Sequence, residues 1–366
     1  MRVLYDGLVY THLFVGGINR YFNNLISHLP ATVTPTVMAC YGNPVTAIAH
    51  PRLRLCLYRS RLLPSRISGR FGAYYFRWVT AQTRPDIIHP TYYSLLTNQA
   101  FARVSYPLVI TVWDMITERF AADLDPLGTI TECKRQAVHA AQAILCISEH
   151  TRQDLLERYP HLEAKTTVTY LATDLHPSMV SAAPVTPRQP YLLYVGGRRG
   201  YKNFDGLLQA LAVIVQNYRD LTLCVVGSPF SAEEQAHIAA LRLGDRIHHA
   251  GLVDDRCLAT LYHHSLALVY PSLYEGFGIP PLEAMVCGTV AIAANCASIP
   301  EVVGDAGLLF DPKQPDELID QLLWVLNNPS ERDRLIAKGQ QRASQFSWQK
   351  TAAETMAVYQ SLCDAK

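Results

Sequence analysis

The feature that most constrains the fold is an alternation of short apolar segments with helical stretches, which is interrupted once along the chain. Expected strands lie at residues 2–5, 36–39, 86–89, 108–112, 143–147, 192–195, 222–226, 247–250, 266–270 and 289–293. Such alternation produces parallel sheets that are covered by helices on both faces. The interruption is a linker that contains Pro177, Pro184, Pro187 and Pro190. The sequence therefore predicts an α/β protein with two Rossmann-like, doubly wound domains, 1–178 and 188–345, that face each other across a cleft, followed by a helix at 346–366.

The stretch from Pro271 to Thr289 carries two carboxylates, Glu275 and Glu283, around a Gly-Phe-Gly turn and a Pro-Pro helix start. Proline is tolerated in the first turn of a helix, so the helix should begin at Ile279 or Pro280. Free N–H groups and the helix dipole attract phosphate at such a terminus, and glycines allow a close approach. Glu283 is placed to bind a ribose diol, and Glu275 a second sugar. The alternative is that Glu283 only complements the helix dipole and that Glu275 only caps the turn.

A second stretch, from Tyr191 to Leu208, begins as a buried strand and continues as a helix from about Asn203. The turn between them holds Gly196, Gly197, Arg198, Gly200 and Lys202. Glycines with two cations suit a diphosphate leaving group, whose developing charge an enzyme must stabilise. Each cation alone could be a solvated surface charge, but the two stretches together favour a shared nucleotide-sugar site.

These motifs resemble those of the retaining glycosyltransferases of the GT-B fold, in the large family 4. The E-x7-E motif falls on Glu275 and Glu283, the VGxRxxYKN loop on 195–203, and the amino-terminal GGxxRY loop on 16–21. Further matches lie at 86–94, 146–156 and 298–312, so the resemblance spans nearly the whole chain.

The resemblance implies a metal-independent transfer of a sugar, without any cofactor, from a nucleoside-diphosphate donor to a hydroxyl of a glycan or a lipid-linked acceptor. It also implies that the last helix crosses back to the first domain. Catalysis would fall to Arg198, Lys202 and Glu275. Contacts with the donor would come from Gly17, Gly197, Gly276, Phe277, Gly278, Ile279 and Glu283.

The first domain is expected to bind the acceptor, through loops that follow its strands. Gly16 and Gly17 precede a helix, and there a simple helix-entry turn is the equal alternative. His89, Tyr92 and Tyr93 follow another strand, and each could instead be a packing residue.

Trp113 departs from the family pattern, because the family commonly has His-Asp where this chain has Trp113 and Asp114. An indole accepts no proton, but it can stack on an apolar sugar face. We therefore expect a donor without the 6-hydroxyl, such as rhamnose or fucose, with mannose as the competing case. The alternative is that Trp113 only packs. Asp114 is a candidate for contact with the acceptor.

Composition and cysteine usage agree with a cytoplasmic enzyme. Nine scattered cysteines without a CxxC pair fit a reducing compartment. No window has the apolar length of a membrane span, and the chain opens as a strand rather than as a signal peptide. We see no cluster of metal ligands, and we expect no nucleic-acid partner.

The segment 52–84 is rich in arginine and contains no acidic residue. Its arginines are Arg52, Arg54, Arg59, Arg61, Arg66, Arg70, Arg77 and Arg84, with Leu62, Leu63, Ile67, Phe71, Tyr75 and Trp78 between them. Such a segment could lie against anionic lipid headgroups, peripherally on the inner face of the membrane. Equally, its arginine stems could cover apolar surface while the guanidinium groups stay hydrated.

Three other functions are alternatives for this sequence. A dinucleotide-dependent oxidoreductase needs GxGxxG after its first strand, which GGINRY does not supply. A GT-B epimerase or phosphorylase shares the fold, since a fold does not fix the reaction. A non-catalytic nucleotide-sugar sensor or scaffold subunit would not need Arg198, Lys202 and Glu275 together.

Overall fold

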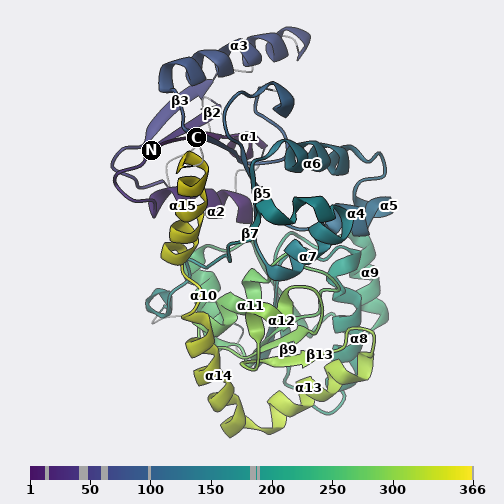
Figure 1. The fold of residues 1–366 in the computed structure, drawn as a ribbon. Helices are drawn as coiled ribbons and strands as arrows, with labels where there is room; N and C mark the ends of the chain where they lie inside the picture. The colour runs from purple at the N-terminus through teal and green to yellow at the C-terminus, as the bar shows by residue number, and fades with distance from the viewer. Residues whose placement is uncertain are drawn as a thin grey trace. The chain divides into compact units, whose positions relative to one another are not determined.

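A computed structural model describes residues 1–12, 16–40, 48–58, 65–97, 100–181, 187 and 190–364. The chain divides into two compact units (Figure 1). Unit 1 comprises 1–171 and 347–366, and unit 2 comprises 172–346. Unit 2 begins earlier than the predicted linker, because the segment after 171 packs with it. Leu175 joins the core of unit 2, and the Ser181 N–H donates to Thr260 Oγ1 at 2.9 Å.

Unit 1 is built on parallel strands. They are β1 (Arg2–Asp6), β2 (Thr34–Cys40), β3 (Arg54–Tyr58), β4 (Ile87–Pro90), β5 (Val109–Val112), β6 (Ala143–Cys146) and β7 (Thr166–Val168). They pair in the orders β3-β2-β1-β4 and β5-β6-β7. A parallel bridge between Ile88 and Leu108 joins the two sets at β4 and β5. The order reverses between β1 and β4, so the loops after these strands meet at a topological switch point.

Helices flank this sheet. They are α1 (Val9–His12), α2 (Gly17–Ser27), α3 (Ser65–Thr83), α4 (Ile116–Arg119), α5 (Ala121–Leu124), α6 (Thr129–Ala140), α7 (Glu149–Arg158) and α15 (Trp348–Asp364), with short 3₁₀ turns at Phe101–Arg103 and Pro160–Lys165. The last helix, α15, lies beside α2 (Figure 1). The ring centres of Trp348 on α15 and Tyr21 on α2 are 6.1 Å apart.

Unit 2 has one parallel sheet. Its strands are β8 (Tyr191–Val195), β9 (Thr222–Val226), β10 (Ile247–Gly251), β11 (Ala267–Tyr270), β12 (Ala291–Ala294) and β13 (Leu308–Phe310). Their order is β10-β9-β8-β11-β12-β13, that of a doubly wound nucleotide-binding fold. Nearly every residue of β8, β9, β11 and β12 is buried, as expected for central strands with helices on both faces.

The helices of unit 2 follow the strands in alternation. They are α8 (Phe204–Ile214), α9 (Ala232–Ala240), α10 (Asp255–His264), α11 (Ile279–Val286), α12 (Ile299–Val303), α13 (Pro315–Asn327) and α14 (Pro329–Ala343), with 3₁₀ turns at Pro177–Met179 and Gly200–Lys202. The predicted α/β class with parallel sheets in two domains is confirmed. The starts predicted near Asn203 and Ile279 are those of α8 and α11.

Candidate active site

The predicted donor residues other than Gly17 lie in the segments that follow β8 and β11 of unit 2. Strands β8 and β11 are neighbours in the sheet, and both run in the same direction. The glycine-rich loop 196–202 follows β8, and the stretch 271–278 follows β11. Ligands of open α/β sheets bind beyond the carboxyl ends of the strands at a topological switch point, such as that between β8 and β11.

Lys202 and Glu275 are brought together by these two loops. Lys202 Nζ donates to Glu275 Oε1 at 2.7 Å, and both side chains are largely buried, with 19% and 11% exposed. A backbone bond from the Leu273 N–H to the Tyr201 carbonyl, 2.7 Å long, ties the loops a second time. The cation and the carboxylate are therefore fixed relative to each other.

The turn before α11 is shaped by glycine, proline and a buried serine. Gly278 caps the helix at φ +113°, a left-handed conformation that favours glycine. Ile279 opens the helix, with Pro280 and Pro281 in its first turn. Ser298 Oγ lies 2.8 Å from the carbonyl oxygens of both Glu275 and Phe277. The Ser298 hydroxyl thus contacts two carbonyl groups of this turn and holds the turn in place.

Phe277 contributes packing to this site. Its ring is buried and meets that of Phe346 at 5.8 Å, edge to face. Any donor contact of Phe277 therefore falls to its backbone. Gly276 beside it is half-buried.

Glu283 is buried in the second turn of α11, with 5% of the residue exposed. The Tyr262 hydroxyl, from α10, donates to its Oε2 at 3.0 Å. Burial, together with the charge of Glu283, raises the pKa of Tyr262 well above its ordinary value, so this hydroxyl stays a donor. One carboxylate oxygen of Glu283 is thereby oriented by the protein.

Arg198 differs from the expectation of an open cation beside Lys202. Its Nε lies 2.7 Å from Glu234 Oε1, and its Nη2 donates to the carbonyl oxygens of Ser228 and Pro229 at 2.9 and 3.0 Å. The guanidinium also lies 4.6 Å from the ring centre of Phe230. With 5% of its side chain exposed, Arg198 is already balanced by a carboxylate.

The loop that carries Arg198 packs closely against the end of β9, and this close contact depends on Gly227. Gly227 has φ +154°, and a Cβ there would lie 2.6 Å from the Gly196 carbonyl oxygen. Only glycine therefore lets the loops after β8 and β9 come so close. Gly197, in contrast, has open space around the position of a Cβ, so its packing does not require glycine.

In unit 1, Gly16 precedes α2 and Gly17 is its first residue. A Cβ on Gly16 would meet nothing within 4 Å. The three residues before them, 13–15, lie outside the described ranges, so both interpretations of this loop stay open.

Trp113 is buried rather than open to a sugar. Only 7% of the residue is exposed, and its ring meets those of Tyr21 and Phe22 on α2 edge to face, at 4.9 and 5.9 Å. The backbone N–H of Trp113 donates to the Tyr93 hydroxyl at 3.0 Å. The expected stacking surface is thus covered by aromatic side chains of unit 1, and the packing alternative describes this structure.

The other residues expected on the acceptor side, Asp114, Tyr92 and His89, differ in burial and in their contacts. Asp114 is partly exposed, and its Oδ1 accepts from the Ile116 N–H at 3.0 Å. Tyr92 is half-buried against Tyr93, with ring centres 4.9 Å apart. His89 is fully buried, with Nδ1 2.6 Å from the Tyr359 hydroxyl and Nε2 2.9 Å from Thr111 Oγ1. The expected acceptor role of His89 is therefore wrong for its side chain, which holds α15 to the sheet.

Sequence reasoning missed three residues that support the site, Glu234, Tyr262 and Ser298. Ser231 and Glu234 form a capping box at the start of α9, and this pattern is visible in the sequence. Its second partner, Arg198, is not. Among the described residues, no group of three or more His, Cys, Asp or Glu could hold a metal ion, and no helix could cross a membrane.

Two family models match the chain in succession. Residues 15–176 match Glycosyltransferase Family 4, and residues 181–342 match Glycosyl transferases group 1. The O-antigen chain mannosyltransferase B of Escherichia coli is 34% identical over 62% of this chain, which is also 62% of that protein's length. The MMP alpha-(1->4)-mannosyltransferase of Mycolicibacterium hassiacum is 29% identical over 75% of this chain and 70% of its own.

Solved structures share the whole fold. Sucrose-phosphate synthase from Thermosynechococcus elongatus superposes with a TM-score of 0.79 at 22% identity, covering 100% of this chain and 99% of its own. HepE from Anabaena, solved in complex with UDP and glucose, gives 0.74 at 17% identity, covering 99% and 100%. At these identities, the likeness concerns the fold alone.

Proposed function

This chain belongs to the GT-B glycosyltransferases, and we propose that it transfers a sugar from a nucleoside diphosphate to an acceptor hydroxyl, with retention at the anomeric carbon. The proposal rests on the 2.7 Å pair of Lys202 and Glu275, at the switch point beside the amino terminus of α11. Here a cation and the positive end of the α11 dipole converge where a diphosphate would leave.

In this mechanism, Lys202 balances the charge that develops on the departing diphosphate. The backbone of Gly276 to Ile279 donates hydrogen bonds, and the dipole of α11 adds to the field. Glu275 orients the transferred sugar, and Glu283 binds the ribose. The acceptor hydroxyl attacks from the face that the diphosphate leaves. These groups supply the charge that a divalent metal would otherwise bring, so no metal is required.

The role proposed for Arg198 follows from its contacts. Both cations pair with a carboxylate, but Arg198 also donates to two carbonyl groups and only 5% of its side chain is exposed, against 19% for Lys202. We therefore assign the main charge neutralisation to Lys202. Arg198 holds the loop after β9 against the glycine loop. It thereby keeps Gly197 in position for the donor.

We propose mannose as the donor sugar. The support comes from relatives named as mannosyltransferases, of O-antigen chains in one case. The reason for expecting a 6-deoxy sugar was a stacking surface on Trp113, and that ring packs against α2 instead. A donor screen with nucleotide-linked mannose, rhamnose and fucose tests this assignment. Turnover restricted to the 6-deoxy donors would overturn it.

The acceptor side of the proposal is a cell-surface glycan under assembly, reached by an enzyme that rests peripherally on a membrane. The contact is assigned to the described part of the arginine-rich segment, on β3 and α3. Leu55 and Leu57 on the edge strand β3 are each 48% exposed, and Trp78 on α3 is 57% exposed. Residues 59–64, with Arg59 and Arg61, lie outside the described ranges, as do the side chains of Arg66, Ile67, Arg70 and Phe71.

The charge of this face favours an anionic lipid surface. Arg52 and Arg54 line a hollow of about 380 Å³ beside the exposed leucines. The Tyr75 hydroxyl donates to the Leu57 carbonyl at 2.9 Å, so α3 and β3 are joined there. Tyr75 also stacks on Trp78 at 5.9 Å. Aromatic and leucine side chains beside arginines are typical of interfacial binding.

Vesicle co-sedimentation tests the membrane contact. The intact chain should sediment with anionic vesicles at low salt and much less with zwitterionic ones. Trp78→Ser should reduce this binding, whereas Leu127→Ser is the matched control, because Leu127 is 89% exposed elsewhere on unit 1. Equal loss in both variants, or no binding at low salt, would overturn the assignment.

The catalytic proposal is tested by product analysis. The chain is incubated with a nucleotide-linked α-mannose and a set of mannosides, and the new linkage is characterised by NMR. An α-linked product supports retaining transfer. A β-linked product contradicts retention, a changed nucleotide sugar without transfer would indicate an epimerase, and donor binding without turnover would indicate a sensor.

A further inference from the structure

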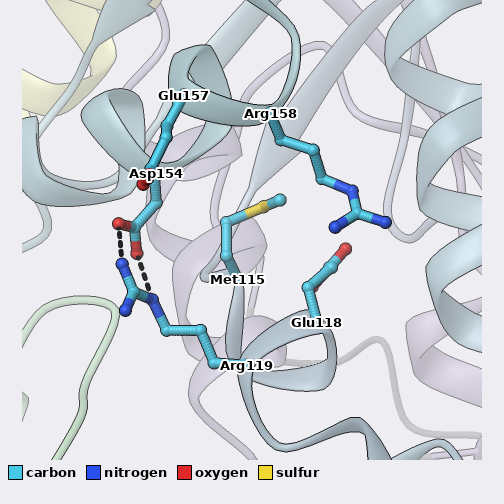
Figure 2. Close-up of a pocket in the computed structure, with 6 residues that line it drawn as sticks. All are labelled: Met115, Glu118, Arg119, Asp154, Glu157 and Arg158. Carbon is cyan, nitrogen blue, oxygen red and sulfur yellow. Dashed lines mark hydrogen bonds and ion pairs between the residues drawn. The ribbon is translucent and has the colours of Figure 1, made fainter.

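A pocket in unit 1 lies between the loop that follows β5 and helix α7. It has a volume of about 310 Å³ and is lined by Met115, Glu118, Arg119, Asp154, Glu157 and Arg158. Figure 2 shows Arg119 and Asp154 on one side, Arg158 extended toward Glu118 on the other, and Met115 between them. The volume is at the lower end of the range of about 300–1,000 Å³ for small-molecule sites. It suits one sugar ring better than a nucleotide.

Two carboxylates of the pocket are held in place by cations. Asp154 Oδ2 accepts from Arg119 Nε at 3.1 Å, and Asp154 Oδ1 accepts from Arg119 Nη2, as the dashed lines of Figure 2 show. Glu118 Oε2 accepts from Lys134 Nζ at 2.8 Å. Only 5% of each carboxylate side chain is exposed. Because the cations fix these groups, binding a hydroxyl there costs little conformational entropy.

The lining of the pocket has no surplus of cations. It carries three carboxylates, those of Glu118, Asp154 and Glu157, and two guanidinium groups, those of Arg119 and Arg158. A phosphate would have to approach these carboxylates without a surplus of cations. An uncharged polyol, in contrast, can donate to the carboxylates and accept from the guanidinium groups at once. The pattern therefore selects against an anionic headgroup.

The pocket shares its loop with the candidate acceptor residue Asp114. Lys134 Nζ donates to the Asp114 carbonyl oxygen at 2.9 Å and to Glu118 in the same turn. Lys134 is 2% exposed and also lies 5.2 Å from the ring centre of Tyr93. One buried cation thus couples the Asp114 backbone to a wall of the pocket.

We propose that this pocket binds one uncharged pyranose unit of the acceptor glycan, through the carboxylates of Asp154, Glu118 and Glu157 and the guanidinium groups of Arg119 and Arg158. The proposal rests on the proposed transferase function for its biological meaning. It names the acceptor class as a neutral sugar rather than a lipid phosphate. Binding itself can be measured without any turnover.

Saturation-transfer NMR with the intact chain tests the binding, with methyl α-D-mannopyranoside, α-D-glucopyranoside and α-D-galactopyranoside as probes. At least one glycoside should give a signal that inorganic phosphate does not compete away. Arg158→Ala and Glu157→Ala should each weaken it about ten-fold, since each removes a charged hydrogen-bonding group. Both residues are exposed, so the fold should survive.

Arg152→Ala is the matched control. Arg152 lies on the same helix but pairs with Glu149 and Glu163, outside the pocket. Its variant should bind as the wild type does. No signal with any glycoside, displacement by phosphate, or equal binding by all four proteins would overturn the pocket assignment.

Kinetics separate this proposal from the transferase proposal. If transfer occurs, Arg158→Ala should raise the KM for the glycoside acceptor, whereas Arg152→Ala should leave this KM unchanged. If the chain neither hydrolyses nor transfers, the transferase proposal fails, while glycoside binding that depends on Arg158 still supports the pocket. If transfer occurs with unaltered acceptor KM in the pocket variants, the pocket assignment fails alone.

Discussion

Lys202 Nζ lies 2.7 Å from Glu275 Oε1, although the two residues are 73 positions apart in the chain. The pair joins the loop after β8 to the loop after β11, and it lies mostly out of solvent. The ammonium group is therefore oriented before any substrate arrives. A charge that needs no reorganisation during the reaction stabilises a transition state more than its ground state.

Lys202→Ala should lower kcat by about 10²–10³ and change the donor KM little, because the charge that Lys202 balances develops mainly as the diphosphate leaves. Steady-state kinetics with varied donor measure this partition. Lys338→Ala is the control, since Lys338 forms an exposed pair with Asp305 at 3.3 Å. A large rise in KM with kcat preserved would assign Lys202 to donor binding instead.

Glu283→Ala should mainly weaken donor binding, and Tyr262→Phe should do the same to a smaller degree. The Tyr262 hydroxyl donates to Glu283 at 3.0 Å, so its removal leaves the carboxylate less well oriented. We expect a donor KM about ten-fold higher for Tyr262→Phe, close to one hydrogen bond to a charged group.

A double-mutant cycle checks that Tyr262 acts through Glu283. The two changes should be strongly non-additive, because the tyrosine has nothing to orient once the carboxylate is gone. Tyr191→Phe is the matched control, since its buried hydroxyl donates to the Leu261 carbonyl at 2.7 Å. An equal KM effect of Tyr191→Phe would point to loosened packing instead.

Glu234→Gln should destabilise unit 2 by about 1–3 kcal/mol, because it leaves the buried guanidinium of Arg198 without its carboxylate. The hydrogen bond with Arg198 holds the pKa of Glu234 below its usual range, which agrees with a charged partner in the folded state. Urea denaturation followed by a probe in unit 2 measures the change. The neighbouring exposed Glu233→Gln should lie within about 0.5 kcal/mol of wild type, and equal stability of the two variants would contradict the role of the pair.

Most of the fold was predictable, and the strands that escaped prediction share a position. β3, β7 and β13 each lie at the edge of the sets in which they pair. Central strands of a parallel sheet are buried on both faces and appear as apolar runs, whereas edge strands need not be. β3 accordingly carries Arg54 and exposed leucines, and the sequence assigned it to the arginine-rich segment instead.

The site was predictable where its chemistry is local in sequence. Lys202 and Glu275 lie in the turns after β8 and β11, and Glu283 lies in the helix that follows the second turn. The glycines and prolines of these stretches indicate where the turns lie and where the helix begins. The partner of Arg198 was not predictable. In the sequence, Glu234 is already accounted for as the acidic residue of the capping box that begins α9, and nothing in that pattern indicates a contact with Arg198. Trp113 failed as a stacking candidate for a related reason. The aromatic residues that cover it, Tyr21 and Phe22, belong to a distant helix.

The stability of unit 1 should depend on the protonation of His89, which burial keeps neutral by lowering its pKa to about 3. An unfolded histidine takes up a proton below about pH 6.5, while the folded one does not until about pH 3. His89 therefore contributes stability that is fully present above pH 6.5 and is lost as the pH falls through that window, by at most about 1.4 kcal/mol per pH unit.

Asp6, in the same unit, changes the free energy of unfolding with pH in the opposite direction. Variants of His89 and of Asp6 therefore separate the two effects. Burial raises the pKa of Asp6 to about 7, so its contribution is present below the unfolded value of about 4 and is lost as the pH rises toward 7. Urea denaturation from pH 5 to 7 should show that His89→Gln loses less stability on acidification than wild type, and that Asp6→Asn loses more. If the three curves run parallel, the pKa values of His89 and Asp6 do not differ between the folded and unfolded states. The expected effect of burial on these two pKa values would then be wrong.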